Sequence, residues 1–367
     1  MTSMKYVGLD VHKESIAVAV AEEGPAEVRY HGTIPATTDA LRTLVRRLGS
    51  PQTLRFAYEA GPCGYGVYRT LTSLGAACVV VAPSLIPQRP GDRVKTDRRD
   101  ACGLARLHRA GELTAVWGPD TGQEAMRDLT RAREDVQLVE TRTRQRLGSF
   151  LLRHDVRVAG RPRWTPAYFS WLATLRFPHP AQHVTLEEYR QAVEDATARV
   201  ARLTEQLEAG VATWSLAPQV HALQCLRGVS LGVASTVMAE IGSLQRFDHP
   251  TELMADIGVV PSEDSTGARI RRGPMTKTGN GHVRRMLIEA SWAYRYPARR
   301  SDHLRRREAT QSDQVKAIAW RAQLRLCGRY QRLAARGKVK QQVVTAVARE
   351  LIAFMWAIDR ATVPAAA

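Results

Sequence analysis

Residues 5–21 read KYVGLDVHKESIAVAVA, two apolar segments joined by the polar triplet His12-Lys13-Glu14. Apolar runs on either side of so short a polar turn predict a β-hairpin. A third strand is expected over Glu27–Thr33, because it follows the turn at Gly24-Pro25. The chain is therefore expected to begin with an antiparallel sheet.

Helical and strand patterns alternate after this hairpin. Thr38 is expected to cap a helix whose apolar residues recur at helical spacing. The later elements are a strand over Leu54–Tyr58, a helix over Gly66–Leu74, a strand over Ala77–Ala82 and a helix starting near Asp97. The order β-β-β-α-β-α-β-α has an antiparallel start and a parallel continuation. It predicts an α/β domain with a mixed sheet, in the order of the ribonuclease H-like fold, over residues 1–118.

The character of the sequence then changes twice. Residues 119–214 are expected to be a helical coiled-coil linker. In its later helix, Thr185 and Glu188 form a capping box. An unbroken seam of three- and four-residue steps follows: Leu186, Tyr189, Val193, Ala196, Val200, Leu203 and Leu207. Such a seam predicts a coiled coil, and either a hairpin packed on itself or a contact between two chains would satisfy it. Residues 215–367 are expected to form a mainly helical domain.

Composition restricts the class of protein. The 367 residues hold 53 Lys and Arg against 36 Asp and Glu, a formal net charge of +17 at pH 7. No apolar run approaches the roughly 20 residues of a membrane helix. Five scattered cysteines without a C-x-x-C pair argue for a reducing cytosol and against a zinc site. We expect a cytoplasmic protein with a polyanionic partner, most simply nucleic acid, although an Arg-rich solubilising surface would carry the same charge.

Four carboxylates occupy positions that favour a metal site. Asp10 ends the first strand and Glu59 ends the fourth, whereas Asp97 and Asp100 lie three apart at the start of a helix and so share a face. A carboxylate among apolar strand residues is costly unless it meets a cation, and oxygen ligands suit Mg²⁺ or Mn²⁺. The alternative for the helical pair is that it complements the helix dipole or pairs with neighbouring arginines. Asp92, on the preceding loop, is not assigned to the site.

A second cluster, within residues 256–287, combines hydroxyl groups with cations. Ser265 and Thr266 precede Gly267, and Gly279-Asn280-Gly281 is a turn that opens the next helix. Basic residues surround the hydroxyl pair: Arg269, Arg271, Arg272, Lys277, Arg284 and Arg285. Cations beside a hydroxyl on a Gly-flexible loop can hold a phosphate while the hydroxyl attacks it. A basic loop without catalytic chemistry would show the same composition.

A glycine-flanked turn precedes that cluster. Residues 226–232 read LRGVSLG, and a helix is expected over Ala234–Ile241. In a helix-hairpin-helix turn, Gly228 and Gly232 would let backbone N–H groups face a nucleic-acid phosphate, and Arg227 would add charge. A plain turn between two helices explains the same glycines.

Taken together, these blocks resemble the insertion-sequence transposases with an N-terminal RuvC-like DEDD domain and a C-terminal domain carrying a catalytic serine, the bridge-RNA-guided recombinases. The matching segments keep the family order over nearly the whole chain: Gly8–Lys13, Tyr58–Ala60, Lys95–Ala101 and Pro261–Asn280. The resemblance places the four acids of the family, which are its catalytic and metal-binding residues, on the carboxylates named above.

The serine of the family lies just before a glycine, where this chain has Thr266. The resemblance therefore places the nucleophile on Ser265 or Thr266, and we assign it to Ser265, the only serine of the pair. It also implies a coiled-coil linker, dimers and tetramers, and an assembly in which the acids of one protomer approach the serine of another. The implied partners are donor DNA, target DNA and a structured guide RNA, in a bacterial cytoplasm and at the nucleoid when the protein acts.

The expected function is DNA strand exchange by Mg²⁺-assisted serine attack. Because no histidine lies in the local motif, the metal or a carboxylate must activate the serine hydroxyl. A metal-dependent nuclease or junction resolvase with an idle serine is one alternative, and a non-catalytic scaffold that binds nucleic acid is another. A small-molecule enzyme is not expected, because the sequence has neither a G-x-G-x-x-G after a strand nor a Walker loop.

Overall fold

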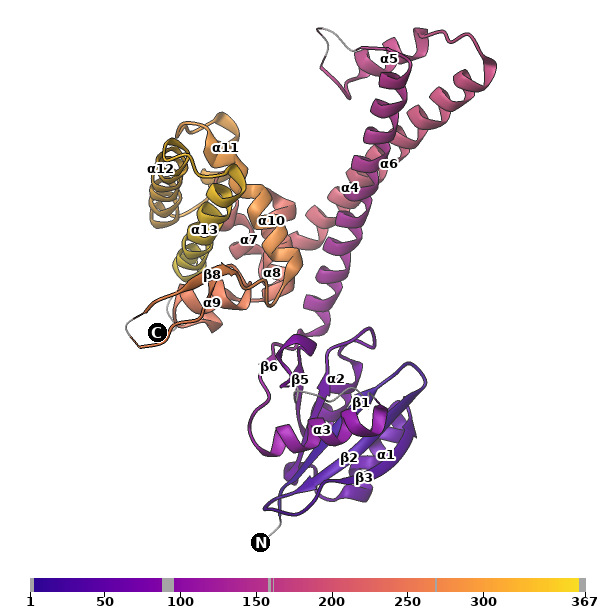
Figure 1. Cartoon of the computed structure of the whole chain (residues 1–367), viewed down its shortest axis with the longest axis vertical. Coiled ribbons are helices and arrows are strands. Elements are labelled where there is room, and N and C mark those ends of the chain that lie inside the picture. The colour runs from indigo at the N-terminus through magenta and orange to yellow at the C-terminus, as the bar shows by residue number, and fades with distance from the viewer. Residues whose placement is uncertain (1–2, 88–95, 158–159, 161, 268, 363–367) are drawn as a thin grey trace. The chain divides into compact units, whose positions relative to one another are not determined.

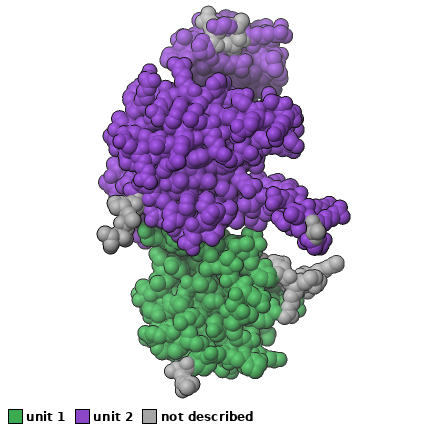
Figure 2. Space-filling view, turned by 90° about the vertical axis from the view of Figure 1, so that its left-hand side faces the viewer, with its two compact units in different colours: residues 1–120 green, residues 121–367 purple. Residues whose placement is uncertain are grey.

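The computed structural model describes residues 3–87, 96–157, 160, 162–267 and 269–362 (Figure 1). Asp92 and Lys95, which the sequence analysis considered, lie outside the described residues. The chain divides at residue 120 into two compact units, coloured separately in Figure 2. Among the described residues, no helix is both long and apolar enough to span a bilayer.

A six-stranded mixed sheet forms the centre of the first unit. Its strands are β1 (Lys5–Val11), β2 (Ser15–Glu22), β3 (Arg29–Pro35), β4 (Leu54–Glu59), β5 (Ala77–Val81) and β6 (Ala115–Val116), in the spatial order β3-β2-β1-β4-β5-β6. The first three strands are antiparallel, as the polar turn predicts, and β1, β4 and β5 run parallel. The predicted mixed α/β domain is therefore confirmed.

Helices cover both faces of this sheet. The apolar sides of α1 (Thr38–Leu48) and α2 (Gly66–Ser73) join a core with Val7 and Leu9 of β1. The helix α3 (Asp97–Arg109) packs on the opposite face, where its buried alanines meet those of β2. Because side chains alternate along a strand, Gly8 and Asp10 lie on the α3 face.

The contact between β1 and α3 is too close for any side chain on Gly8. A Cβ there would lie 2.2 Å from the carbonyl oxygen of Ala101 and 2.4 Å from the backbone nitrogen of Ala105. The missing side chain therefore lets α3 rest directly on β1, with its first turn toward the carboxyl end of the strand that carries Asp10.

Two long helices begin the second unit. The helices α4 (Thr121–Arg153) and α6 (Pro180–Ala212) pack side by side as a hairpin, and α5 (Pro166–Thr174) lies in the connection between them (Figure 1). The capping box predicted at Thr185 is wrong: α6 begins five residues earlier, capped by His179 and Gln182. The sequence analysis missed this start because histidine is not among the usual capping residues.

The rest of the second unit is a helical domain around one large core. Its helices are α7 (Ala217–Leu223), α8 (Leu231–Ile241), α9 (Pro250–Asp256), α10 (Gly281–Ser291), α11 (Asp302–Glu308), α12 (Asp313–Ala335) and α13 (Lys340–Thr362). A small hairpin of β7 (Pro261–Glu263) and β8 (Arg272–Met275) projects from it between α9 and α10. The predicted, mostly helical C-terminal region is confirmed.

We predict that Gly8→Ala lowers the free energy of unfolding by about 3 kcal/mol, because a methyl group would overlap backbone atoms that cannot rotate away. Urea-induced unfolding followed by circular dichroism measures the change. The control is Gly103→Ala in α3, where a Cβ meets nothing within 4 Å; this change should be neutral or stabilising because it removes a helical glycine. Equal stability of Gly8→Ala and the parent chain would contradict the close contact.

Candidate active site

Asp10 and Glu59 lie at the carboxyl ends of neighbouring parallel strands. The β1–β4 register pairs Leu9 with Tyr58, so each acid is the next residue along its strand. The side chain of Asp10 is 15% exposed. Both acids line a cavity of about 920 Å³ at this end of the sheet, together with His12 and the start of α1.

The first turn of α3 brings a third carboxylate to this edge. Thr96 caps the helix by accepting a hydrogen bond from the backbone N–H of Arg99 at 3.3 Å. Asp97 and Asp100 lie in the first turn, where the helix dipole favours negative charge. Asp97 is well exposed, whereas Asp100 is partly buried.

His12 lies between the end of β1, which carries Asp10, and the first turn of α3, which carries Asp97. Its Nε2 lies 3.1 Å from Oδ2 of Asp10 and 3.5 Å from Oδ1 of Asp97. Ligand atoms of Asp10, His12 and Asp97 all fall within 4.8 Å of one another. Among the described residues, Glu59 and Asp100 lie outside that group. The sequence analysis placed His12 in the turn and gave it no role, although its place two residues after Asp10, directly past the end of β1, was a usable signal.

Ser265 lies on the exposed arm of the β7–β8 hairpin. Its Oγ donates a hydrogen bond to Oε1 of Glu263 at 2.9 Å and accepts one from the backbone N–H of Arg271 at 3.2 Å. Thr266 instead makes a backbone bridge with Arg269 that closes the hairpin. Of the two hydroxyl residues, Ser265 is thus the one held between a carboxylate and an N–H donor. The sequence analysis missed Glu263, and its place two residues before Ser265 was the available signal.

The predicted basic residues divide into two groups. The side chains of Arg269, Arg271, Arg272 and Lys277 are exposed around the hairpin, and Arg272 lies 3.8 Å from Glu263. The others already have protein partners: Arg284 donates to the carbonyls of Ile257 and Thr278, Arg285 pairs with Glu134, and Arg227 donates to the carbonyl of Pro297. The structure therefore gives this second group a role within the protein itself.

The two glycines of the predicted nucleic-acid turn lie close to neighbouring elements. A Cβ on Gly228, whose φ is +83°, would lie 2.2 Å from the carbonyl oxygen of Ala290. A Cβ on Gly232 would lie 2.9 Å from Nη1 of Arg133. Close approach of backbone therefore explains Gly228, whereas the Arg133 side chain could move away from a Cβ on Gly232.

A buried ion-pair network supports the base of the serine hairpin. Glu240, at the end of α8, has a fully buried side chain that accepts two hydrogen bonds from Arg131 of α4, at 2.6 and 3.0 Å. It also accepts one from Asn280 at 2.7 Å, and Asn280 caps α10 directly after the hairpin. The network thus fixes the turn that follows β8 to both α4 and α8.

Comparison with known proteins decides the family. Residues 7–154 match the model of a transposase DEDD domain, and residues 220–305 match the model described as the IS116/IS110/IS902 transposase family. A protein of Sinorhizobium fredii named as transposase y4qE is 47% identical over 97% of this chain and 88% of its own length. The transposase of insertion sequence element IS1533 from Leptospira borgpetersenii is 30% identical over 89% of this chain and 96% of its own.

The chain belongs to the IS110 family of transposases. It is therefore an enzyme that cuts and rejoins DNA. The relatives come from bacteria. This IS110 transposase carries the DEDD domain, which implies the use of a divalent metal ion.

The residues at the sheet edge fit such an ion. Two carboxylates and one imidazole present their ligand atoms within 4.8 Å of one another, and Glu59 lines the same cavity. Carboxylate oxygens suit Mg²⁺ and Mn²⁺, and an imidazole nitrogen is more readily accepted by Mn²⁺. Among the described residues, Asp10, His12 and Asp97 are the group whose ligand atoms already lie close enough to share one ion.

We predict that Asp10→Asn weakens Mn²⁺ binding to the full chain by on the order of 100-fold, because even outer partners of metal ligands contribute up to that factor. Isothermal titration calorimetry measures the affinity. Asp302→Asn is the control, because Asp302 is an exposed acid of the second unit that pairs only with Arg305 among the described residues. Unchanged Mn²⁺ affinity in Asp10→Asn would exclude this edge as the metal site.

We predict that Glu240→Gln destabilises the protein by on the order of 3 kcal/mol at neutral pH, because it leaves the buried Arg127 and the hydrogen-bonded Arg131 without their counter-charge. Burial raises the pKa of Glu240, but the hydrogen bonds from Arg131 and Asn280, with the charges of Arg131 and Arg127, outweigh it and lower the pKa below 4.5. The stabilisation is therefore present above pH 4.5 and is lost as the pH falls through the lower folded value.

Urea unfolding as a function of pH tests this expectation. The difference in stability between the parent chain and Glu240→Gln should stay constant near neutral pH and narrow in acid. Glu289→Gln, at an exposed carboxylate on α10, is the matched control and should change little at any pH. A Glu240 variant as stable as the parent at neutral pH would show that the network contributes nothing.

Proposed function

We propose that this transposase joins DNA strands through a covalent link to Ser265, assisted by Mg²⁺ held at Asp10, Glu59, Asp97 and Asp100. The observation that carries the proposal is the placement of Ser265 Oγ between the Glu263 carboxylate and the Arg271 N–H. Serine hydroxyls are weak nucleophiles near neutral pH and need a base. Glu263, which accepts the hydrogen bond of the Ser265 hydroxyl, is the proposed base.

Each neighbour of the serine has a defined task. Glu263 accepts the Oγ proton as Oγ attacks the phosphorus, and the N–H of Arg271 orients the attacking oxygen. The new bond joins Oγ to phosphorus, the bond from phosphorus to a deoxyribose oxygen breaks, and that oxygen takes a proton from water. The phosphoserine link conserves the phosphodiester for rejoining. Arg269, Arg272 and Lys277 are exposed nearby and would contact phosphates.

The fold of the first unit supports the metal-binding half of the proposal. Strand order β3-β2-β1-β4-β5, antiparallel then parallel, agrees with a ribonuclease H-like domain of the RuvC type. A bound divalent ion would polarise the scissile phosphate and ease deprotonation of the attacking hydroxyl. Glu59 and Asp100 complete the acidic set by their positions on β4 and α3, next to the elements that carry Asp10 and Asp97.

Structured guide RNA and a second copy of the chain are the proposed partners. A net charge of +17 supports binding to both DNA and RNA, mostly through phosphates. Two apolar residues of the long helix α4, Leu138 and Val139, are 41% and 39% exposed. Apolar side chains exposed on the outside of the helical hairpin support a coiled-coil contact between two chains. That contact would form a dimer, and the proposed tetramer would need a second interface between dimers.

The test is whether the protein becomes covalently attached to DNA. Full chain purified with its bound RNA is incubated with Mg²⁺ and labelled DNA that spans the junction between its insertion sequence and the flank. We predict a protein–DNA adduct that denaturation does not separate and that mass spectrometry maps to Ser265. Ser265→Ala should abolish it, Thr266→Ala should retain it, and Glu263→Gln should slow it by about 10²–10⁴-fold, as loss of a general base does.

The same adduct assay distinguishes the proposed serine mechanism from its alternatives. Strand cleavage without an adduct in the parent chain and in Ser265→Ala would favour a metal-dependent nuclease or junction resolvase. An adduct lost in Thr266→Ala and kept in Ser265→Ala would move the nucleophile to the threonine. If neither Asp10→Ala nor Glu59→Ala changed any DNA reaction, the first unit would have no catalytic role. That result would favour the non-catalytic scaffold that binds nucleic acid.

A further inference from the structure

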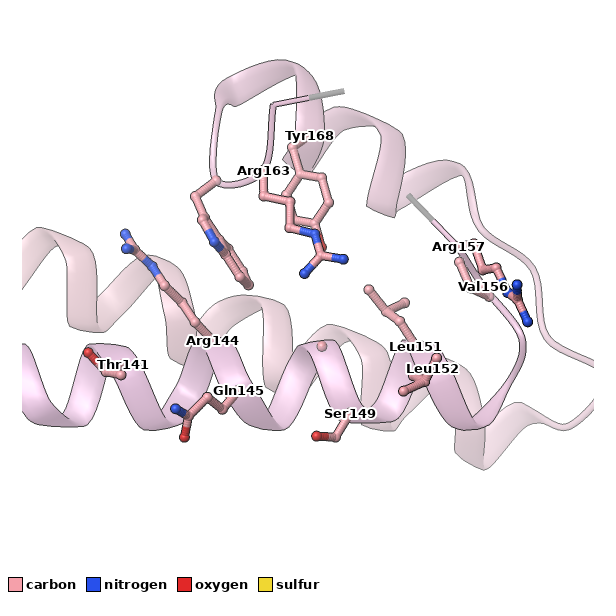
Figure 3. A pocket seen from close by; sticks show the side chains of 12 residues that line it. Thr141, Arg144, Gln145, Ser149, Leu151, Leu152, Val156, Arg157, Arg163 and Tyr168 are labelled. Carbon is pink, nitrogen blue, oxygen red and sulfur yellow. The ribbon is translucent and has the colours of Figure 1, made fainter. Parts of the chain in front are cut away.

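A cavity of about 720 Å³ lies at the end of the α4–α6 hairpin, far along α4 from the serine hairpin, where no function has been assigned (Figure 3). The last part of α4 forms its floor. The segment before α5 and the start of α5 form the opposite side. Its volume is within the range of about 300–1,000 Å³ that small-ligand sites have.

The lining combines aromatic rings with arginines. Trp164 and Tyr168 meet edge to face with ring centroids 5.3 Å apart, and the Arg144 guanidinium lies 5.3 Å from the Trp164 centroid. Figure 3 shows the Arg163 guanidinium beside Tyr168, above α4. Arg157 adds a third cation. Arg157 is paired with Asp155 and Arg144 with Glu140, so the anionic ligand would be held mainly by Arg163. Arg163 makes no ion pair with any residue that the structure describes.

Two features of this cavity are costly for folding. The backbone at Trp164 has a φ of +66°, a left-handed conformation that bulky L residues avoid. Gly148 lies inside α4, where glycine disfavours the helix, yet a Cβ on it would meet nothing within 4 Å. Packing therefore does not require this glycine, and its effect is to leave the floor of the cavity open.

We propose that this cavity binds one unpaired nucleotide of a nucleic-acid strand, with the base against Trp164, which the buried Tyr168 supports from behind, and the phosphate at Arg163. A ligand for this lining must carry negative charge and a flat apolar face together, and a nucleotide does both. Single-stranded RNA and single-stranded DNA share this chemistry. The site requires neither serine chemistry nor a metal, so it stands or falls separately from the proposed mechanism.

Photo-crosslinking of the full chain to short single strands tests the site. One arm uses RNA containing 5-iodouridine and the other uses DNA containing 5-iodo-2′-deoxyuridine, which both crosslink to stacked aromatic rings. We expect crosslinks on the peptide that holds Trp164 and Tyr168, and the arm with the higher yield identifies the strand. Gly148→Leu fills the floor without a clash at its Cβ and should lower that yield at least about fivefold, as should Arg163→Ala.

The matched control is Arg142→Ala, at an exposed arginine of α4 outside the cavity, which should leave the yield unchanged. Circular dichroism establishes that all three variants fold. The proposal is overturned if crosslinks map only to other peptides, or if Gly148→Leu retains the parental yield. It is also overturned if the parent chain self-associates, Gly148→Leu makes it monomeric, and crosslinking persists. The cavity would then hold a second copy of the chain.

Discussion

The bare backbone of Gly8 is the constraint on which the sheet-edge site depends. No side chain separates β1 from α3, and a Cβ would overlap backbone atoms of Ala101 and Ala105. The helix therefore lies at one fixed height on the strand, and its first turn brings Asp97 within 3.5 Å of His12, itself 3.1 Å from Asp10. Ligand atoms of Asp10 and Asp97 lie within 4.8 Å of each other. Two carboxylates that close repel one another, so the contact of α3 with β1 and the bridging His12 have to hold them together.

Ser265 is held in place differently, through contacts at the base of its hairpin. The β7–β8 hairpin has too few strands to be stable alone, and its support comes from its base. A Cβ on Gly279 would lie 1.7 Å from the carbonyl oxygen of Asp256, so the turn after β8 fits tightly against the end of α9. Glu240 ties the next residue, Asn280, to Arg131 of α4. The hairpin is thus rigid where it leaves the domain and exposed at its tip.

The sequence predicted what depends on local pattern. Two apolar stretches around a polar turn located β1 and β2, and the start of α3 near Asp97 was also predicted. His12 and Glu263 were missed because their roles arise only when chain segments meet in space. The same applies to Arg284 and Arg285: a count of charges cannot distinguish an arginine that awaits a phosphate from one already bound to protein carbonyls or to Glu134.

The two halves of the chemistry therefore have different mechanical character. The acids are attached to a sheet covered by helices on both faces, and Asp10 follows directly on the fully buried Leu9. The serine is attached to an exposed arm whose neighbours are solvated arginines, and regions with few buried contacts open at low cost in free energy. Phosphates bound by Arg269, Arg272 and Lys277 would replace that solvent and order the arm. In the mechanism proposed above, an exposed arm would let Ser265 stay attached to the strand that it carries while the arm changes conformation.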